Sequence, residues 1–299
     1  MDFQLGAPPD EIFDNGQYPF GVTLVIENVG EEDVVVTGNR DFAVVTLVGI
    51  DPVQFGLSRD SVNQVIPQDM RGAAKLSDGT EVPGDIAMVS FPNDGELMSY
   101  KPNLEGTDEI LLRAEICYDY RTRATSLICI KDRVLDNLYN DKICSINEPK
   151  VVQNSGAPVH VTALKQIPQG KSNTQVTFTV EHVGSGMFFK QGSARRCDDS
   201  ITNIDQNQVY VKVRFADDQN LARSTLISCP VFGVGKSEGM LNLFQGQPRE
   251  VSCIIKGDPT QNRVFQDVLL VELDYTYLNF VEKPIIIRDV ATEEDYEIG

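Results

Sequence analysis

The sequence predicts an all-β protein made of two copies of one domain, each folded as a Greek-key sandwich. One observation is that segments from the first half of the chain return in the same order in the second half. The other is that each copy holds short stretches of alternating apolar and polar residues, the period of a half-buried strand, separated by turn residues. About seven such strands in each copy are typical of a two-sheet sandwich.

The repeat consists of three matched segments that lie about 150 residues apart. Three matches in one order indicate a duplicated domain, and this has to be recognised before strands are assigned. The matched pairs are Gly6–Pro8 with Gly156–Pro158, Val22–Gly30 with Val176–Gly184, and Ala114–Asp132 with Val271–Asp289.

The first copy begins its strands at Val22–Glu27, where apolar and polar residues alternate. Asn28-Val29-Gly30 then supplies a turn, in which glycine can adopt a positive φ. Residues rich in β-branched and aromatic side chains predict the strands that follow. These are Phe42–Ile50, Ile86–Phe91, and a hairpin of Leu111–Tyr120 with Ser126–Lys131 that turns near Arg123.

The second copy repeats this order, with the turn at His182-Val183-Gly184. Pro284 is expected to begin its strand or to lie at a sheet edge, because proline has no N–H to donate to a ladder. The expected strands are Val176–Glu181, Val209–Phe215, Val251–Ile255, and a hairpin of Val268–Tyr277 with Pro284–Arg288.

These elements predict two sandwich domains at residues 1–132 and 156–290, joined by a linker at 133–155 and followed by an acidic tail at 291–299. Within the linker, Arg133–Tyr139 forms either one or two helical turns or part of a loop that Cys144 ties to a domain face.

The charge of the chain excludes some partners. It has 26 basic and 44 acidic residues, a net charge of −18. Binding to phosphates needs clustered lysine and arginine, so no nucleic-acid partner is expected. The apolar runs, such as Val44–Ile50, are far shorter than the roughly 20 residues of a membrane helix, so no membrane span is expected in this chain.

Six cysteines predict disulfides, because none has the spacing of a zinc or haem site; the alternative is six buried free thiols in a cytosolic protein. Disulfides imply an oxidising compartment, so we expect an extracellular or cell-surface location. The N-terminus has no signal peptide, which favours a mature or truncated chain. The disulfide candidates are Cys117, Cys129, Cys144, Cys197, Cys229 and Cys253.

Two pairings remain open in the first copy. Cys117 and Cys129 lie opposite each other if the hairpin turns near Arg123, whereas Cys129 with Cys144 closes a short loop. In the second copy, Cys229 and Cys253 lie on strands expected to be neighbours, which leaves Cys197 as the odd one.

Catalytic motifs are absent from the sequence, and we do not expect an enzyme. The chain has two histidines, His160 and His182, and His182 stands where the first copy has Asn28, a turn position rather than a catalytic one. Gly233–Ser237 resembles a phosphate loop only faintly, since it lacks the spacing and the following helix.

Acidic clusters in predicted loops are weak candidates for calcium binding, with plain solvation of loop tips as the alternative. We expect no cofactor, and calcium is the single candidate. The candidates are Glu31, Glu32, Asp33, Asp198, Asp199, Asp217 and Asp218, and a further acidic cluster lies in the tail.

A Tyr-x-Tyr motif occurs in both copies, as Tyr118 with Tyr120 and as Tyr275 with Tyr277. Period two places both rings of a motif on one face of a strand. Their presence in both copies favours packing of a sandwich face, and the alternative is an aromatic contact patch for a glycan or a neighbouring subunit.

Val22–Gly30 and Val176–Gly184 resemble the strand followed by Asn-Val-Gly of cell-adhesion-related, immunoglobulin-like repeats in prokaryotic surface proteins. With the Gly-Ala-Pro openings and the Cys117-Tyr-x-Tyr strand, the chain is similar to tandem-domain envelope proteins of archaea; His182 departs from the Asn of the motif. The resemblance implies two tandem immunoglobulin-like β-sandwiches in a secreted or surface-anchored structural or adhesive protein, without catalytic residues.

The expected function is that of a structural subunit of a surface layer, filament or pilus-like assembly. It would associate with itself or other surface proteins through edge strands and domain faces. The segments before Gly6 and after Asp289 are candidates for exchanged strands. The alternatives are an adhesion or ligand-binding module for a glycan or protein, and a virion structural protein.

Overall fold

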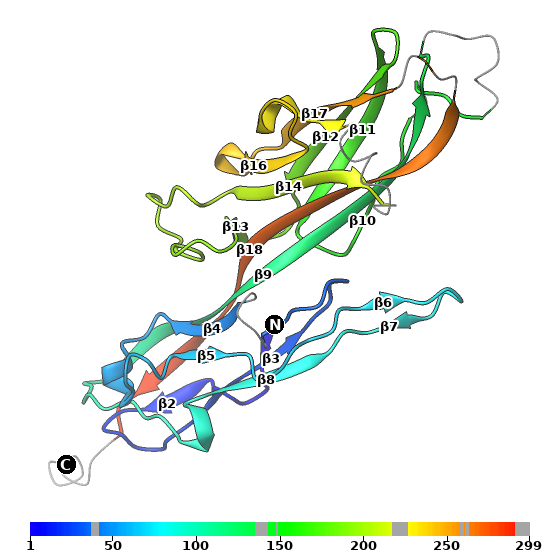
Figure 1. Cartoon of the computed structure of the whole chain (residues 1–299). Helices are drawn as coiled ribbons and strands as arrows, with labels where there is room; N and C mark the ends of the chain where they lie inside the picture. Colours follow the sequence, from blue (N-terminus) through cyan, green and yellow to red (C-terminus); the bar gives the residue numbers. More distant parts are fainter. Residues whose placement is uncertain are drawn as a thin grey trace, which may run out of the picture. The chain divides into compact units, whose positions relative to one another are not determined.

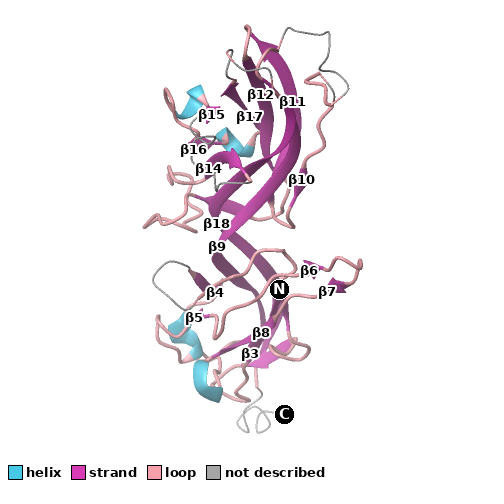
Figure 2. Ribbon diagram, turned by 45° about the vertical axis from the view of Figure 1, so that its right-hand side comes forward, coloured by secondary structure: helices cyan, strands magenta, loops and turns pink. Residues whose placement is uncertain are grey.

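The computed structural model describes residues 1–36, 42–134, 143–147, 149–216, 227–257, 260 and 263–290 (Figure 1). Within these residues the chain forms strands β1 to β18 and the short 3-10 helices η1 to η4. The strands form several mostly antiparallel sheets, and the helices span only three or four residues each (Figure 2). The all-β class predicted from the sequence is confirmed.

The chain divides into two compact units. Unit 1 comprises Met1–Tyr118 and Leu278–Gly299, and unit 2 comprises Asp119–Tyr277. These bounds differ from the expected domains at 1–132 and 156–290, because β9 (Thr107–Lys131) and β18 (Val264–Arg288) each contribute residues to both units. Each unit therefore contains residues from both sequence repeats.

Unit 1 holds a three-stranded sheet of order β1-β3-β8 and a second sheet in which β4 pairs with β5 and β9. Strand β2 pairs in parallel with the end of β18. Alternate residues of β3 and β4 are buried, as the alternation predicts. The elements before β9 are β1 (Asp2–Phe3), β2 (Glu11–Phe13), β3 (Val22–Glu27), β4 (Ala43–Val48), η1 (Pro52–Phe55), β5 (Asn63–Val65), β6 (Ala74–Lys75), β7 (Glu81–Val82), β8 (Ile86–Phe91) and η2 (Asn93–Gly95).

Unit 2 holds a four-stranded sheet of order β11-β12-β17-β15 and a second sheet of order β16-β14-β18-β9. Strand β14 buries every second residue, and the core of the unit is rich in aromatic and β-branched side chains. The elements other than β9 and β18 are β10 (Gln153–Asn154), β11 (Val159–Gln169), β12 (Asn173–His182), β13 (Met187–Phe189), β14 (Gln208–Phe215), β15 (Ile227–Ser228), η3 (Pro230–Phe232), β16 (Glu238–Asn242), η4 (Phe244–Gly246) and β17 (Arg249–Lys256).

The two expected hairpins are wrong: each is one strand of 25 residues. The polar stretch around Arg123 suggested a turn, but its side chains pair across the sheet. Arg121 forms an ion pair with Asp274, and Arg123 lies 3.9 Å from a carboxylate oxygen of Glu272. Arginine and threonine are compatible with a strand when a neighbouring strand supplies the opposite charge.

Pro284 lies inside β18 instead of at its start. Every second N–H along a strand points to the same side, so the nitrogen of Pro284 faces the side on which Ile286 donates to the Asp10 carbonyl at 3.0 Å. The ladder with β2 begins at Ile286 paired with Glu11. The missing donor of Pro284 therefore precedes this ladder.

The linker runs back along β9 where the structure describes it. Gln153 and Asn154 form β10 and pair with Thr125 and Ala124 of β9. Most of Arg133–Tyr139, for which helical turns or a loop were expected, lies outside the described residues, as does the tail at 291–299.

Candidate functional site

The candidate functional site is the outer edge of β8 in unit 1. Strand β8 is the last strand in the order β1-β3-β8. Its buried residues are Ala87, Val89 and Phe91, whereas Ile86 and Met88 are each 56% exposed. The strand is therefore apolar on both faces, although only one face packs into the core.

The backbone register shows which groups of β8 point outward. Asn28 donates to the Asp85 carbonyl at 3.1 Å, and Ile26 lies opposite Ala87. In an antiparallel pair, bonded and non-bonded positions alternate, so the N–H and C=O groups of Ile86, Met88 and Ser90 point away from β3. Among the residues that the structure describes, no strand pairs with this side of β8.

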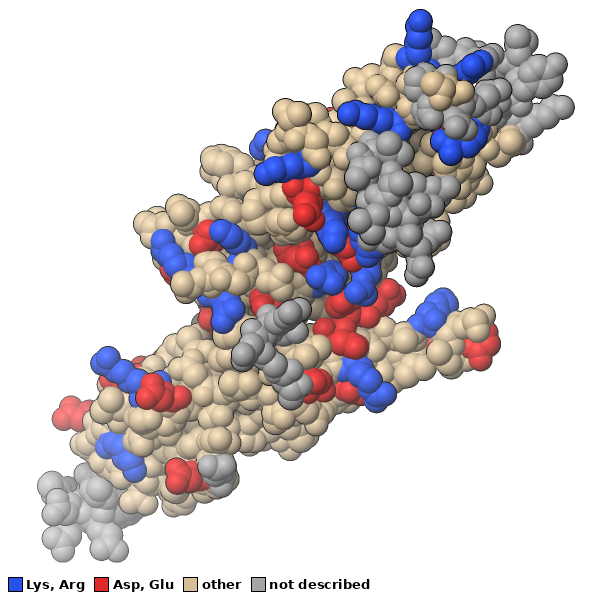
Figure 3. Space-filling model, in the orientation of Figure 1, with Lys and Arg blue, Asp and Glu red and all other residues tan. Residues whose placement is uncertain are grey.

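On the exposed face beside this edge, the residues of β1, β3 and β8 include acidic but no basic side chains. Met88 lies opposite Val25 of β3, and Ile86 lies opposite Glu27. Asp2 of β1 lies on the far side of Val25. In Figure 3 the area of unit 1 over which β8 runs shows mostly uncharged residues, with charged ones towards its margins.

Exposed edge strands are usually protected by lysine, proline, a bulge or a covering segment. In unit 2 the corresponding strand, β17, is flanked by β15, and the disulfide between Cys229 and Cys253 fastens the segment after β15 to it. Strand β8 has Pro92 only beyond its end. The Gln68 side chain donates to the Ile86 carbonyl at 3.5 Å, so the unprotected part of the apolar edge begins after Ile86.

A hairpin of β6 and β7 precedes this edge and extends from unit 1 (Figure 1). Leu76 and Val82 are about half exposed on it. Its base is fixed by Arg71, whose guanidinium lies 3.1 Å from a carboxylate oxygen of Asp85. The hydrogen bond from Arg71 lowers the pKa of Asp85, so this contact is charged at neutral pH.

Unit 2 carries a cross-strand charge ladder on β14, β18 and β9. Arg214 donates to both carboxylate oxygens of Glu272, at 3.0 and 3.2 Å. Burial acts to raise the pKa of Glu272, but the hydrogen bond and charge of Arg214 outweigh it and the pKa is lowered. These opposite charges match the strands within the unit, so the ladder is a structural feature.

Three of the four motif tyrosines are buried in unit 2, so they do not form an exposed aromatic patch. Tyr275 is fully buried, and the exposed fractions of Tyr120 and Tyr277 are 5% and 3%. Their hydroxyls bond inside the unit: Tyr120 donates to the Gly156 carbonyl, and Tyr275 lies 3.0 Å from the Thr122 hydroxyl. Tyr118 belongs to β9 in unit 1 and is partly exposed.

His182 lies at the end of β12 against Tyr277. Its Nε2 is 3.2 Å from the Tyr277 hydroxyl, and its ring contacts Phe188. Burial lowers the pKa of His182, because the imidazolium loses solvation. With a hydroxyl partner and an apolar neighbour, this histidine has a structural role.

The lowered pKa of His182 predicts a pH-dependent stability. The unfolded chain takes up the proton first, near its ordinary pKa of about 6.5, so the free energy of unfolding should fall as the pH drops below that value. The slope of this component is at most about 1.4 kcal/mol per pH unit. His182→Asn, which introduces the residue of the first repeat, should remove it. Urea denaturation between about pH 5 and pH 8 measures both proteins, and equal slopes would contradict the prediction.

All six cysteines are disulfide-bonded. The bond between Cys129 and Cys144 is present, so Cys117 does not pair with Cys129, and the bond between Cys229 and Cys253 is also present. Cys197 is not a free thiol. The expected hairpin that placed Cys117 opposite Cys129 is absent, because both residues belong to one strand.

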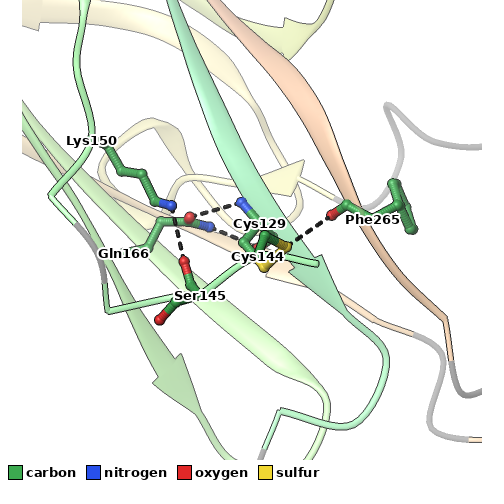
Figure 4. Close-up of a disulfide and its surroundings, with 6 residues drawn as sticks. All are labelled: Cys129, Cys144, Ser145, Lys150, Gln166 and Phe265. Atoms are coloured by element: carbon green, nitrogen blue, oxygen red, sulfur yellow. Dashed lines mark hydrogen bonds between the residues drawn. A yellow bond between two sulfur atoms is a disulfide. The ribbon is translucent and has the colours of Figure 1, made fainter. Parts of the chain in front are cut away.

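The disulfide of Cys129 fastens the linker to β9 (Figure 4). Gln166 of β11 pairs with the backbone of Cys129, accepting from its N–H at 2.9 Å and donating to its carbonyl at 3.0 Å. Lys150 donates to the Ser145 carbonyl at 3.0 Å. Cys144 is therefore tied to β9, whereas most of Arg133–Tyr139 lies outside the described residues.

The acidic candidates do not gather into a cation site where the structure describes them. Asp33 accepts from the Gly72 N–H at 2.8 Å, and Asp198 forms an ion pair with Arg195 at 3.0 Å. Within the described residues, including Glu31, Glu32 and Asp199, no three His, Cys, Asp or Glu side chains meet as metal ligands would. Asp217 and Asp218 lie outside the described residues.

No known protein-family profile matches the chain, and a search of curated proteins finds no match. Among the described residues, no helix has the length and apolar character that crossing a bilayer requires.

Proposed function

We propose that the protein is a non-enzymatic, extracellular structural subunit of two immunoglobulin-like β-sandwiches, which associates with further copies of itself through the edge of β8. The observation that carries this proposal is the unprotected edge around Met88, where the side chains of Ile86 and Met88 are exposed and the backbone groups of Met88 face outward. An apolar edge without protecting charges favours strand addition.

The β8 edge is suited to pairing with the same edge of a second copy. An antiparallel pair centred on Met88 places the two Met88 side chains opposite each other and Ile86 opposite Ser90. None of these residues is charged, so the ladder brings no like charges into opposition despite the net charge of −18. The methionine side chains adapt their shape to the contact.

The disulfides support the extracellular part of the proposal. Disulfide-bonded cysteines persist in oxidising compartments and are rare where thiols are kept reduced. Every cysteine of this chain is in a disulfide. The interspersed charges on the face seen in Figure 3 agree with a protein partner better than with nucleic acid.

Met88→Lys tests this proposal. Lysine on an edge strand opposes pairing because its charge must be desolvated, so the concentration needed for assembly should rise by about tenfold or more. Light scattering and negative-stain electron microscopy of the non-reduced protein measure this. Leu127→Lys is the control, because Leu127 is 49% exposed and lies in unit 2. This variant should assemble like the natural chain.

Two results would contradict the proposal. One is equal assembly of the natural chain and Met88→Lys. The other is a natural chain that stays monomeric and binds a glycan or protein specifically, which would favour an adhesion or ligand-binding module.

A further inference from the structure

The pairing of β9 with β18 is symmetric with respect to the sequence repeat. The hydroxyl of Thr276 donates to the carboxylate of Asp119, and these residues are 157 positions apart. The same interval relates Ala114–Tyr120 to Val271–Tyr277 in the sequence. Asp119 is therefore bonded to its own equivalent in the other repeat.

Beyond Asp119 and Thr276, the strand of each repeat continues into the unit that the other repeat mainly forms. Residues 119–131 of β9 belong to unit 2, and residues 278–288 of β18 belong to unit 1. The two repeats have thus exchanged the second halves of their last strands within one chain. The unit that receives such a half-strand gains core residues it does not encode in its own repeat.

We define residues 278–290 as the terminal strand. Its Ile285 and Ile287 are 1% and 0% exposed in the core of unit 1. It pairs in parallel with β2, where Ile286, Ile287 and Arg288 lie opposite Glu11, Ile12 and Phe13.

Polar contacts fix the terminal strand along its length. Lys283 lies 2.8 Å from a carboxylate oxygen of Asp10 and donates to the Pro8 carbonyl at 2.7 Å. At the end, the Val290 N–H donates to the Asp14 carboxylate at 2.9 Å.

We infer that the terminal strand of one copy can occupy unit 1 of a second copy, completing its sheet in place of that copy's own strand. The inference rests on the proposed function as an assembling subunit. Every contact of the terminal strand with unit 1 is the same whether the strand comes from the same chain or from another. Exchange of an identical element is a low-cost route between copies, and concentration decides which form prevails.

This contact supplies what the β8 edge lacks. Pairing of β8 with β8 uses the same surface on both copies, so it closes after two subunits. A terminal strand placed in unit 1 of the next copy uses two different surfaces, so it forms a closed dimer when the exchange is reciprocal and a chain of copies when each strand passes to a further copy. A filament or layer needs such a propagating contact, or a second self-complementary surface, in addition to the pair formed by β8.

A cross-link between the terminal strand and β2 tests the inference. Glu11→Cys with Ile286→Cys places two thiols at paired positions of neighbouring strands, within the reach of a disulfide. The matched control is Thr177→Cys with Ser252→Cys, a pair whose hydroxyls are 3.0 Å apart across β12 and β17. Both full-length variants are unfolded in urea with native disulfides intact, refolded at high concentration, oxidised, and run on a non-reducing denaturing gel.

We expect Glu11→Cys with Ile286→Cys to give a ladder of dimers and higher species, and the control to remain a monomer. A ladder that disappears when the same protein is refolded at about a hundredfold lower concentration would support exchange through mass action. Monomers alone at high concentration, with the cross-link formed, would overturn the inference.

Failure of strand exchange can be distinguished from failure of the proposed function. Assembled particles whose cross-links all lie within single chains overturn exchange and leave the proposed function standing. A cross-linked ladder without particles in the microscope supports exchange and contradicts the structural-subunit proposal.

Discussion

A chain that ends after Tyr277 is expected to fold unit 2 but to leave unit 1 unfolded, although the sequence of residues 1–118 is unchanged. The deletion removes Leu278, Ile285 and Ile287 from the core of unit 1. Loss of one buried isoleucine side chain costs about 2–5 kcal/mol, and a domain is stable by only about 5–15 kcal/mol. Hydrogen exchange of the amides in β3, β4 and β8 should therefore lose its protection, while β12 and β17 keep theirs.

A chain that ends after Val290 is the control, because it keeps the pairing of the terminal strand with β2 and the hydrogen bond from Val290 to Asp14. The point variant Ile287→Asp provides a second measurement if the shortened chain is degraded. A buried carboxylate without a partner should destabilise unit 1 by several kcal/mol, about 4 or more. Native-like protection of β3 and β8 in both variants would show that unit 1 does not depend on the terminal strand.

The repeat and most of the strands could be predicted from the sequence, because both depend on local patterns of residues. The segments Val22–Glu27 and Ile86–Phe91 are β3 and β8 with the expected bounds. Alternation shows that a segment is a strand, but it contains nothing about the strand's partner or its length beyond a polar stretch. Arg121 and Arg123 therefore suggested a turn, since the pairing of Arg121 with Asp274 joins positions 153 residues apart.

The candidate site was missed for a related reason. Ile86-Ala87-Met88-Val89 is apolar at every position, and the sequence does not tell which face is buried. A strand that is apolar on both sides and lacks lysine was a usable signal for an exposed edge. For the tyrosine motif, repetition in both copies favoured packing over an exposed patch, and Tyr275 and Tyr277 lie in the core.

Gly184 has a role that its turn position did not indicate. The sequence suggested a positive φ, but neither Gly30 nor Gly184 is among the glycines with that conformation. A Cβ atom at Gly184 would lie 2.3 Å from the Tyr277 hydroxyl oxygen and 2.6 Å from Cβ of Pro158. The glycine therefore permits close approach of Tyr277, whose hydroxyl accepts from the Gly186 N–H at 2.7 Å.

Gly184→Ala should consequently destabilise unit 2 by about 3 kcal/mol, the upper range for forcing an atom into a packed core. Tyr277→Phe alone should cost about 1–2 kcal/mol, because the buried Gly186 N–H loses its acceptor. The double variant should be less destabilised than the sum of the two by more than about 1 kcal/mol, since removing the hydroxyl relieves one of the two close contacts. Urea denaturation of the natural chain, the two single variants and the double variant measures this coupling energy. Val183→Ala is the control: Val183 is a half-exposed neighbour, so this variant should change the free energy of unfolding by less than about 0.5 kcal/mol. Strictly additive effects would show that the Tyr277 hydroxyl is not what excludes a side chain at Gly184.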